Sequence, residues 1–191
     1  MSLRRFWLGL STVTGLGARG FFIPHRYAGA IATSQPIYAE IAKLLAAHET
    51  AFQQTLRLID AVADDITSFS GPPPAPRWAQ DWFPRTDGAA AYAMVRHHRP
   101  ARLIEVGSGH STRFIAQAIA DGGFSCAVTA IDPAPRAAID ALPINVIRQP
   151  VQQVPGDLFG QLNAGDVLYI DSSHILMPGT DVDHLFSRVL P

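Results

Sequence analysis

Cysteine, lysine and net charge are all scarce in this chain. Cys126 is the only cysteine, Lys43 is the only lysine, and the formal net charge of the 191 residues is −1. A lone cysteine excludes an internal disulfide, so we expect a reducing, cytoplasmic compartment. The lack of a basic bias argues against nucleic acid as a partner, because binding the phosphate backbone requires a basic surface.

Long apolar runs are absent as well, although 48% of the residues are hydrophobic. No segment approaches the length of a membrane span, so we expect no membrane partner. Residues 1–33 contain five glycines, which argue against a long helix, and we expect a surface arm there. Arg4 and Arg5 precede a short apolar run, but no small-residue cleavage site of a secretory signal follows it.

Residues 34–68 carry a helical pattern. Ser34 is a suitable N-cap and Pro36 suits a first helical turn, so the pattern predicts one long helix or a pair of helices. The apolar face of the predicted helix needs a partner, which is either the main domain or the same helix of a second copy. A homo-oligomer formed through the long helix is therefore one expectation. Its apolar face repeats every three or four residues, at Ile37, Ile41, Leu44, His48, Phe52, Leu56, Ile59 and Ala63.

Prolines interrupt the chain at residues 71–76, where four of the six residues are proline. Because proline fixes φ and lacks an amide donor, this composition predicts a stiff, extended linker. We therefore expect an N-terminal arm and long helix at 1–70 and a separate domain at 77–191.

The residues after this linker alternate between short apolar runs and helical patterns. Elements in this order predict parallel strands joined by right-handed crossovers. We therefore expect an α/β domain with a Rossmann-like, doubly wound parallel sheet. Thr86 or Asp87 is the expected cap of the first helix, and Ser111 or Thr112 that of the second. The expected strands are 103–106, 126–131, 144–147 and 166–171, and the expected helices are 89–98, 112–120 and 137–142.

A glycine turn follows the first of these strands. Gly107 and Gly109 break the apolar run, because glycine tolerates a positive φ and lets a ligand approach the bare backbone. Acidic residues stand at or near the ends of three strands, namely Glu105, Asp132 and Asp171. The carboxyl ends of parallel strands form the edge at which open α/β sheets bind ligands, so the pattern predicts a ligand site there.

Three segments stand at the ends of these strands, namely Glu105-Val-Gly107-Ser-Gly109-His, Ala130-Ile-Asp132-Pro and Leu168-Tyr-Ile-Asp171-Ser-Ser-His174. In this order they resemble the class I S-adenosylmethionine-dependent methyltransferases, and more narrowly bacterial members that pair a Gly-Ser-Gly-His-Ser-Thr loop with an Asp-x-x-His segment. Sugar O-methyltransferases are similar in the last segment. The resemblance begins near Trp78, and it implies that the domain is truncated at its C-terminal end, where further strands would stand.

The resemblance implies which residues hold the methyl donor, S-adenosylmethionine. Gly107, Ser108 and Gly109 would run along its methionine portion. Glu105 would hold its amino group, and Asp132 would accept hydrogen bonds from its ribose hydroxyls.

The resemblance also implies the chemistry. The expected reaction is methylation of a hydroxyl on a small molecule or sugar, with His174 as general base, because imidazole exchanges a proton near neutral pH. Asp171 would orient His174 or bind a divalent metal such as Mg²⁺. The other metal carboxylates of the similar sugar methyltransferases belong to a strand that this chain lacks, so we expect an incomplete metal site at best.

Two other functions fit the same turn. An NAD-dependent oxidoreductase uses a similar layout, but Thr112 stands where its fingerprint has a third glycine. A non-catalytic module that binds a nucleoside or mediates dimerisation is consistent with the missing strands. Trp78, Trp82 and Phe83 also allow two interpretations: they seat the preceding linker by packing, or they form a pocket wall that faces the sulfonium cation.

Overall fold

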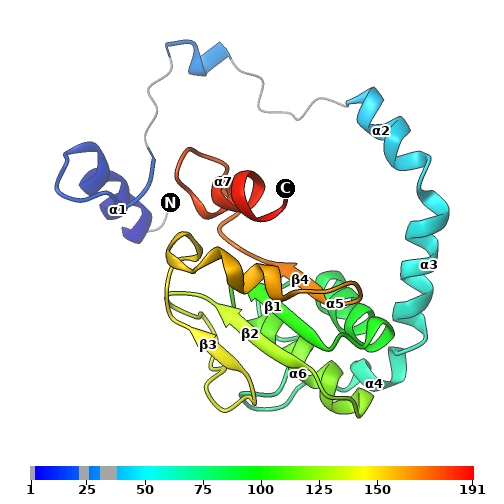
Figure 1. The fold of residues 1–191 in the computed structure, drawn as a ribbon. Helices are drawn as coiled ribbons and strands as arrows, with labels where there is room; N and C mark the ends of the chain where they lie inside the picture. The colour runs from blue at the N-terminus through cyan, green and yellow to red at the C-terminus, as the bar shows by residue number, and fades with distance from the viewer. Residues whose placement is uncertain (1–2, 22–25, 31–37) are drawn as a thin grey trace. The chain divides into compact units, whose positions relative to one another are not determined.

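A computed structural model describes residues 3–21, 26–30 and 38–191 (Figure 1). It divides into two compact units, Met1–Ala46 and Ala47–Pro191. Gly9 lies inside the first helix of the first unit, so this glycine-rich segment still forms a helix of 11 residues. The described elements of the first unit are α1 (Leu3–Val13), the short 3-10 turn η1 (Ala28–Ala30) and α2 (Ala39–Ala46).

The segment predicted as one long helix or a pair of helices forms three shorter ones. Its expected N-cap, Ser34, lies outside the described residues. After α2 come α3 (Glu49–Asp60) and α4 (Ala63–Thr67). His48 and Val62, which precede α3 and α4, have φ of −108° and −114° with ψ of 11°. These values leave the helical region, so the prediction of a single helix is wrong.

The N-terminal boundary of the second unit lies before α3. This helix packs against α5 (Arg85–His98), and Ile59 contributes to the hydrophobic core. The boundary between the two units therefore falls between Ala46 and Ala47, whereas the sequence predicted it at the prolines. Phe52 and Leu56 of the apolar stripe remain 48% and 53% exposed, and association of two copies through this helix stays a prediction.

The proline segment is a closed loop inside the second unit and not an extended linker. Ser70 and Arg77, on either side of it, form an isolated antiparallel bridge. The amide of Trp78 donates to the carbonyl of Phe69 at 3.1 Å. The two rings stack with centroids 6.0 Å apart, and both contact Phe114. Aromatic packing thus draws the two ends of the loop together.

A parallel sheet of four strands forms the centre of the second unit, as predicted (Figure 1). Every neighbouring pair is parallel and the order is β3-β2-β1-β4. Val106 pairs with Ile131 on one side and Ile170 on the other, so these three strands end in register. Their carboxyl ends therefore open onto one edge. The strands are β1 (Arg102–Val106), β2 (Ala127–Ile131), β3 (Asn145–Ile147) and β4 (Val167–Ile170).

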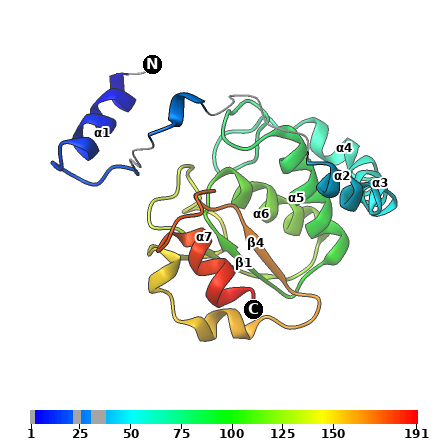
Figure 2. The same cartoon turned by 90° about the horizontal axis from the view of Figure 1, so that it is seen from above.

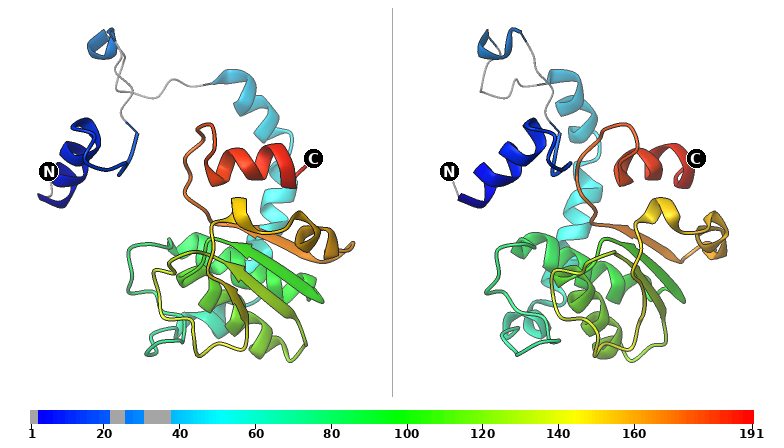
Figure 3. Two further views of the ribbon diagram at one scale, coloured as in Figure 1. Left: turned by 60° about the vertical axis from the view of Figure 1, so that its left-hand side comes forward. Right: turned by 90° about the vertical axis from the view of Figure 1, so that its left-hand side faces the viewer.

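Both faces of the sheet are covered, as a parallel sheet requires. Leu103 and Val128 face a core shared with α5 and α6 (His110–Gly122), which lie side by side (Figure 2). Ile104 and Ile131 join a second core on the opposite face (Figure 3). That face is covered by η2 (Val151–Gln153), η3 (Gly156–Gln161), α7 (Asp181–His184) and the π-helical turn η4 (Leu185–Val189).

Helix ends differ from the sequence expectations at several points. α5 begins at Arg85 with Pro84 as N-cap, so Thr86 and Asp87 lie in its first turn and do not cap it. Residues 137–142 form turns, not the predicted helix. Within the described part of the chain, no helix has both the length and the hydropathy needed to cross a membrane.

Candidate functional site

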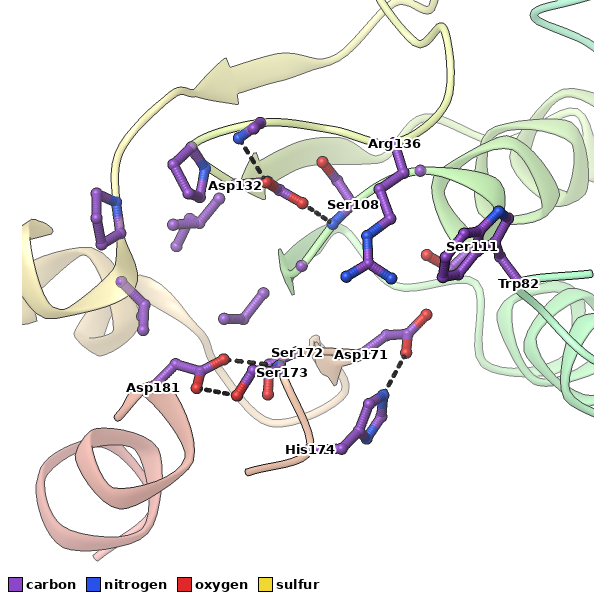
Figure 4. A pocket seen from close by; sticks show the side chains of 18 of the residues that line it. Trp82, Ser108, Ser111, Asp132, Arg136, Asp171, Ser172, Ser173, His174 and Asp181 are labelled. Atoms are coloured by element: carbon purple, nitrogen blue, oxygen red, sulfur yellow. Dashed lines mark hydrogen bonds and ion pairs between the residues drawn. The ribbon is translucent and has the colours of Figure 1, made fainter. Parts of the chain in front are cut away.

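A cavity of about 700 Å³ opens at the carboxyl edge of the sheet (Figure 4). Cavities of this size are typical of small-molecule sites. Most of its lining comes from the loops that follow β1, β2 and β4, at residues 107–111, 132–134 with 136, and 171–174. The parallel register brings these loops together, although they are far apart in the sequence.

The glycine turn after β1 is closely packed against the loop after β4. Gly107 has a φ of +82°, and a Cβ there would collide with the carbonyl oxygen of Asp171. Its amide donates to the carbonyl of Ile131 at 2.9 Å, and the amide of Asp171 donates to Val106 at the same distance. Only glycine satisfies both the positive φ and the close approach.

Asp132 fastens the glycine turn to the end of β2. Its Oδ2 accepts a hydrogen bond from the amide of Ser108 at 2.7 Å, and its Oδ1 accepts one from the amide of Ala134 at 2.7 Å. The carboxylate also lines the cavity, where it is partly exposed. Each carboxylate oxygen can accept more than one hydrogen bond, so Asp132 keeps capacity for a ligand hydroxyl.

Glu105 does not line the cavity, in contrast to its expected contact with the donor's amino group. The side chain is fully buried, and its two oxygens accept hydrogen bonds from the hydroxyls of Ser111 at 2.6 Å and Thr112 at 2.7 Å. The Thr112 hydroxyl in turn accepts a hydrogen bond from the amide of Gly109 at 2.9 Å. Glu105 therefore braces the turn from behind.

This bracing also explains why the predicted cap of the second helix is wrong. The N-cap of α6 is Gly109, and the hydroxyls of Ser111 and Thr112 serve the buried carboxyl instead. Burial raises the pKa of Glu105 from 4.5 to about 7, and the nearby charges of Asp171 and Asp132 add to the rise. The two hydroxyl hydrogen bonds act in the opposite direction, because they favour the charged form.

Asp171 and His174 form the pair that the sequence predicted. Nε2 of His174 lies 3.3 Å from Oδ1 of Asp171 (Figure 4). The side chain of Asp171 is 30% exposed and that of His174 is 76% exposed. His174 has a φ of +60°, a conformation that costs a non-glycine residue about 1 kcal/mol or more. Such strain is typical of functional loops.

Asp181 fastens this loop to the start of α7. Its carboxylate accepts hydrogen bonds from the amide of Ser173, at 2.8 Å, and from its hydroxyl. Burial works to raise the pKa of Asp181, but these hydrogen bonds outweigh it and the pKa is lowered. Asp181 and Ser173 are eight residues apart, so their link is visible only in the fold.

Arg136 and Trp82 form a cationic, aromatic side of the cavity that the sequence did not predict as a unit. The guanidinium carbon lies 4.7 Å from the centre of the Trp82 ring. Trp82 is 67% exposed, whereas Phe83 is buried and packs on Phe114 with ring centroids 5.7 Å apart. The two interpretations of the aromatic residues thus apply to different members: Trp78 packs in the core, Trp82 lines the cavity, and Phe83 does both.

A divalent metal is not supported by the side chains around Asp171. Among the described residues, no group of three or more histidine, cysteine, aspartate and glutamate side chains could hold a metal ion. A carboxylate and one exposed imidazole do not form a cage for Mg²⁺, which prefers oxygen ligands in octahedral geometry. The described residues around Asp171 therefore do not fit a divalent metal.

Comparisons with known proteins add nothing to this geometry. No protein-family model matches the chain, and neither curated proteins nor solved structures contain a match.

Proposed function

We propose that the second unit binds S-adenosylmethionine and directs transfer of its methyl group to a hydroxyl on a small molecule or sugar. The proposal depends on one observation, the meeting of three strand ends around a single cavity. Bare backbone at Gly107, the carboxylate of Asp132 and the Asp171–His174 pair all border that cavity. An open backbone, an acceptor for ribose hydroxyls and a candidate base thus share one site.

The polar atoms of the lining fit a ligand of this kind. Among the described residues, Oγ of Ser108 and Nδ1 of His110 are buried without a hydrogen-bond partner. Buried polar groups normally have partners, so a ligand rich in donors and acceptors suits these positions. When bound, S-adenosylmethionine supplies a methyl group activated by the positive sulfonium. Gly107, Ser108 and Gly109 would hold its amino-acid portion and Asp132 its ribose.

His174 is the candidate base for the methyl acceptor. Its Nε2 lies 3.3 Å from Oδ1 of Asp171, and in the tautomer that carries its proton on Nε2 the Nδ1 atom would have a free lone pair. Nδ1 would accept the proton of the acceptor hydroxyl, and the oxygen would then be a stronger nucleophile. The carboxylate of Asp171 fixes the ring orientation and stabilises the imidazolium that results.

Titration calorimetry with S-adenosylhomocysteine, the product left after methyl transfer, and with NAD⁺ tests the proposal. We expect S-adenosylhomocysteine to bind and NAD⁺ not to bind. Asp132→Asn keeps the side-chain volume but removes its charge, and it should weaken S-adenosylhomocysteine about tenfold or more. Asp157→Asn is the matched control, because Asp157 is exposed and lies outside the cavity lining, and it should bind like the wild type.

The outcomes separate the alternatives. Binding of NAD⁺ without S-adenosylhomocysteine would refute the proposal and favour the oxidoreductase. Binding of neither ligand would refute a nucleoside site of either kind. Equal affinity of the Asp132→Asn variant and the wild type would remove Asp132 from the ligand contacts.

A further inference from the structure

Arg136 is held in an orientation suited to binding an anion. It is the only arginine or lysine among the described residues that line the cavity. Figure 4 shows its side chain extending from the loop after β2 into the space between Ser108 and the Asp171–His174 pair. Cζ of Arg136 lies over the face of the Trp82 ring, and a cation–π contact of this kind leaves guanidinium N–H groups free to donate to an anion.

The acids that line the cavity already have other partners. Asp132 accepts from two backbone amides, Asp171 is paired with a histidine, and Asp181 accepts from a serine. No ion pair among the described residues involves Arg136. The cavity therefore presents a cationic fork whose natural partner, an anion with two oxygens, is not supplied by its own side chains.

His110, which lines the cavity, lies in the field of two arginines that are not part of the lining. Burial lowers the pKa of His110, and the charges of Arg113 and Arg77 lower it further. In the described part of the chain, one guanidinium nitrogen of each arginine is buried without a hydrogen-bond partner, and Arg113 as a whole is only 2% exposed. These cations have no acidic partner among the described ion pairs, so their field favours an anion near His110, although neither of them contacts the cavity.

We propose that Arg136 binds the carboxylate of the amino-acid portion of the methyl donor, an inference that rests on the proposed function. The loop of Arg136 lies against the glycine turn, since a Cβ on Gly109 would stand 3.8 Å from the backbone nitrogen of Arg136. Under the proposed function this turn runs along the amino-acid portion, and Glu105 is buried away from it. A guanidinium matches a carboxylate in charge and in bidentate geometry.

Calorimetry with S-adenosylhomocysteine and 5′-methylthioadenosine tests this assignment. Both ligands carry adenosine and a thioether, but only the first has the amino-acid portion. Arg136→Gln should weaken S-adenosylhomocysteine about tenfold or more and leave 5′-methylthioadenosine unchanged, because it removes a charge-assisted donor pair. Arg136→Lys keeps the charge but loses the bidentate geometry, so its affinity for S-adenosylhomocysteine should lie between those of the wild type and Arg136→Gln. Arg99→Gln is the matched control: Arg99 stacks on Phe124 at 4.9 Å and lies outside the cavity lining.

Each outcome bears on the inference. If the wild type binds both ligands and Arg136→Gln changes neither affinity, the stack on Trp82 is only a surface contact and the inference fails while the proposed function stands. An equal loss for both ligands would show a contact to adenosine and would also overturn it. If the wild type binds neither ligand, the proposed function fails and the inference fails with it.

Discussion

Replacing Glu105 by glutamine should change how the stability of the protein depends on pH. The wild-type carboxyl is fully buried and accepts hydrogen bonds from two hydroxyls, with no cation among its described hydrogen-bonding partners. Burial holds its pKa at about 7 in the folded state, above the ordinary value of 4.5. Glutamine has nearly the same shape, can accept from one hydroxyl and donate to the other, and carries no ionisable proton.

The sign and size follow from linkage between protonation and folding. Between pH 4.5 and pH 7 the folded protein keeps this proton while the unfolded chain has lost it, so the contribution of Glu105 to stability is fully present below pH 4.5 and is lost as the pH rises to 7. One pKa unit corresponds to about 1.4 kcal/mol, so the shift from 4.5 to 7 corresponds to about 3 kcal/mol in the free energy of unfolding. Glu105→Gln has no such proton to lose. The free energy of unfolding of the variant, relative to that of the wild type, should therefore increase by about 3 kcal/mol between pH 4.5 and pH 7.

Urea unfolding followed by circular dichroism, from pH 4.5 to pH 8.5, measures the effect. The informative quantity is the difference between the variant and the wild type, because the other titrating groups are common to both. Asp60→Asn is the control, since Asp60 is exposed at the end of α3, and its difference from the wild type should stay flat. A flat difference for Glu105→Gln would show that the buried carboxyl ionises freely and would refute the reasoning.

Two further substitutions test the turn and the core. Gly107→Ala should destabilise the protein by about 2 kcal/mol or more, because it combines a positive φ with a collision against the Asp171 carbonyl. Gly160→Ala is the control, since nothing lies within 4 Å of a Cβ there. Equal urea unfolding midpoints for the two variants would contradict the argument. Phe114→Ala should cost about 3–5 kcal/mol in the free energy of unfolding, because the ring is fully buried among other aromatics. Phe186→Ala, at a 67% exposed site, should cost far less, and a similar cost for both would contradict the assigned core.

The sheet could be predicted because its strands are short apolar runs separated by helical patterns. That pattern fixes which segments are strands, and the handedness of parallel connections restricts their order. The proline segment could not be assigned in the same way, since proline is compatible with an extended linker and with a closed loop. The bridge between Ser70 and Arg77 distinguishes the two, and it depends on the packing of Phe69 and Trp78 over α6.

The candidate site was predictable in its backbone but less so in its side chains. Gly107, Asp132 and Asp171 lie at one cavity because parallel strand ends meet at one edge. Glu105 lies in β1, two residues before Gly107, but the hydroxyls of Ser111 and Thr112 bind its carboxyl behind the turn. Sequence spacing does not show this. Arg136 was missed because its stack on an indole is a long-range contact with no local signature.

The first turn of α6 has consequences for attempts to change the ligand preference of this protein. His110 faces the cavity, the next two residues hold Glu105, and Phe114 fills the aromatic core, so one short stretch of helix shapes the site and supports the whole sheet. Substitutions in this stretch would change ligand binding and the stability of the fold together. The side of the cavity formed by Trp82 and Arg136 is exposed, so selection for new ligands should find variants there that still fold.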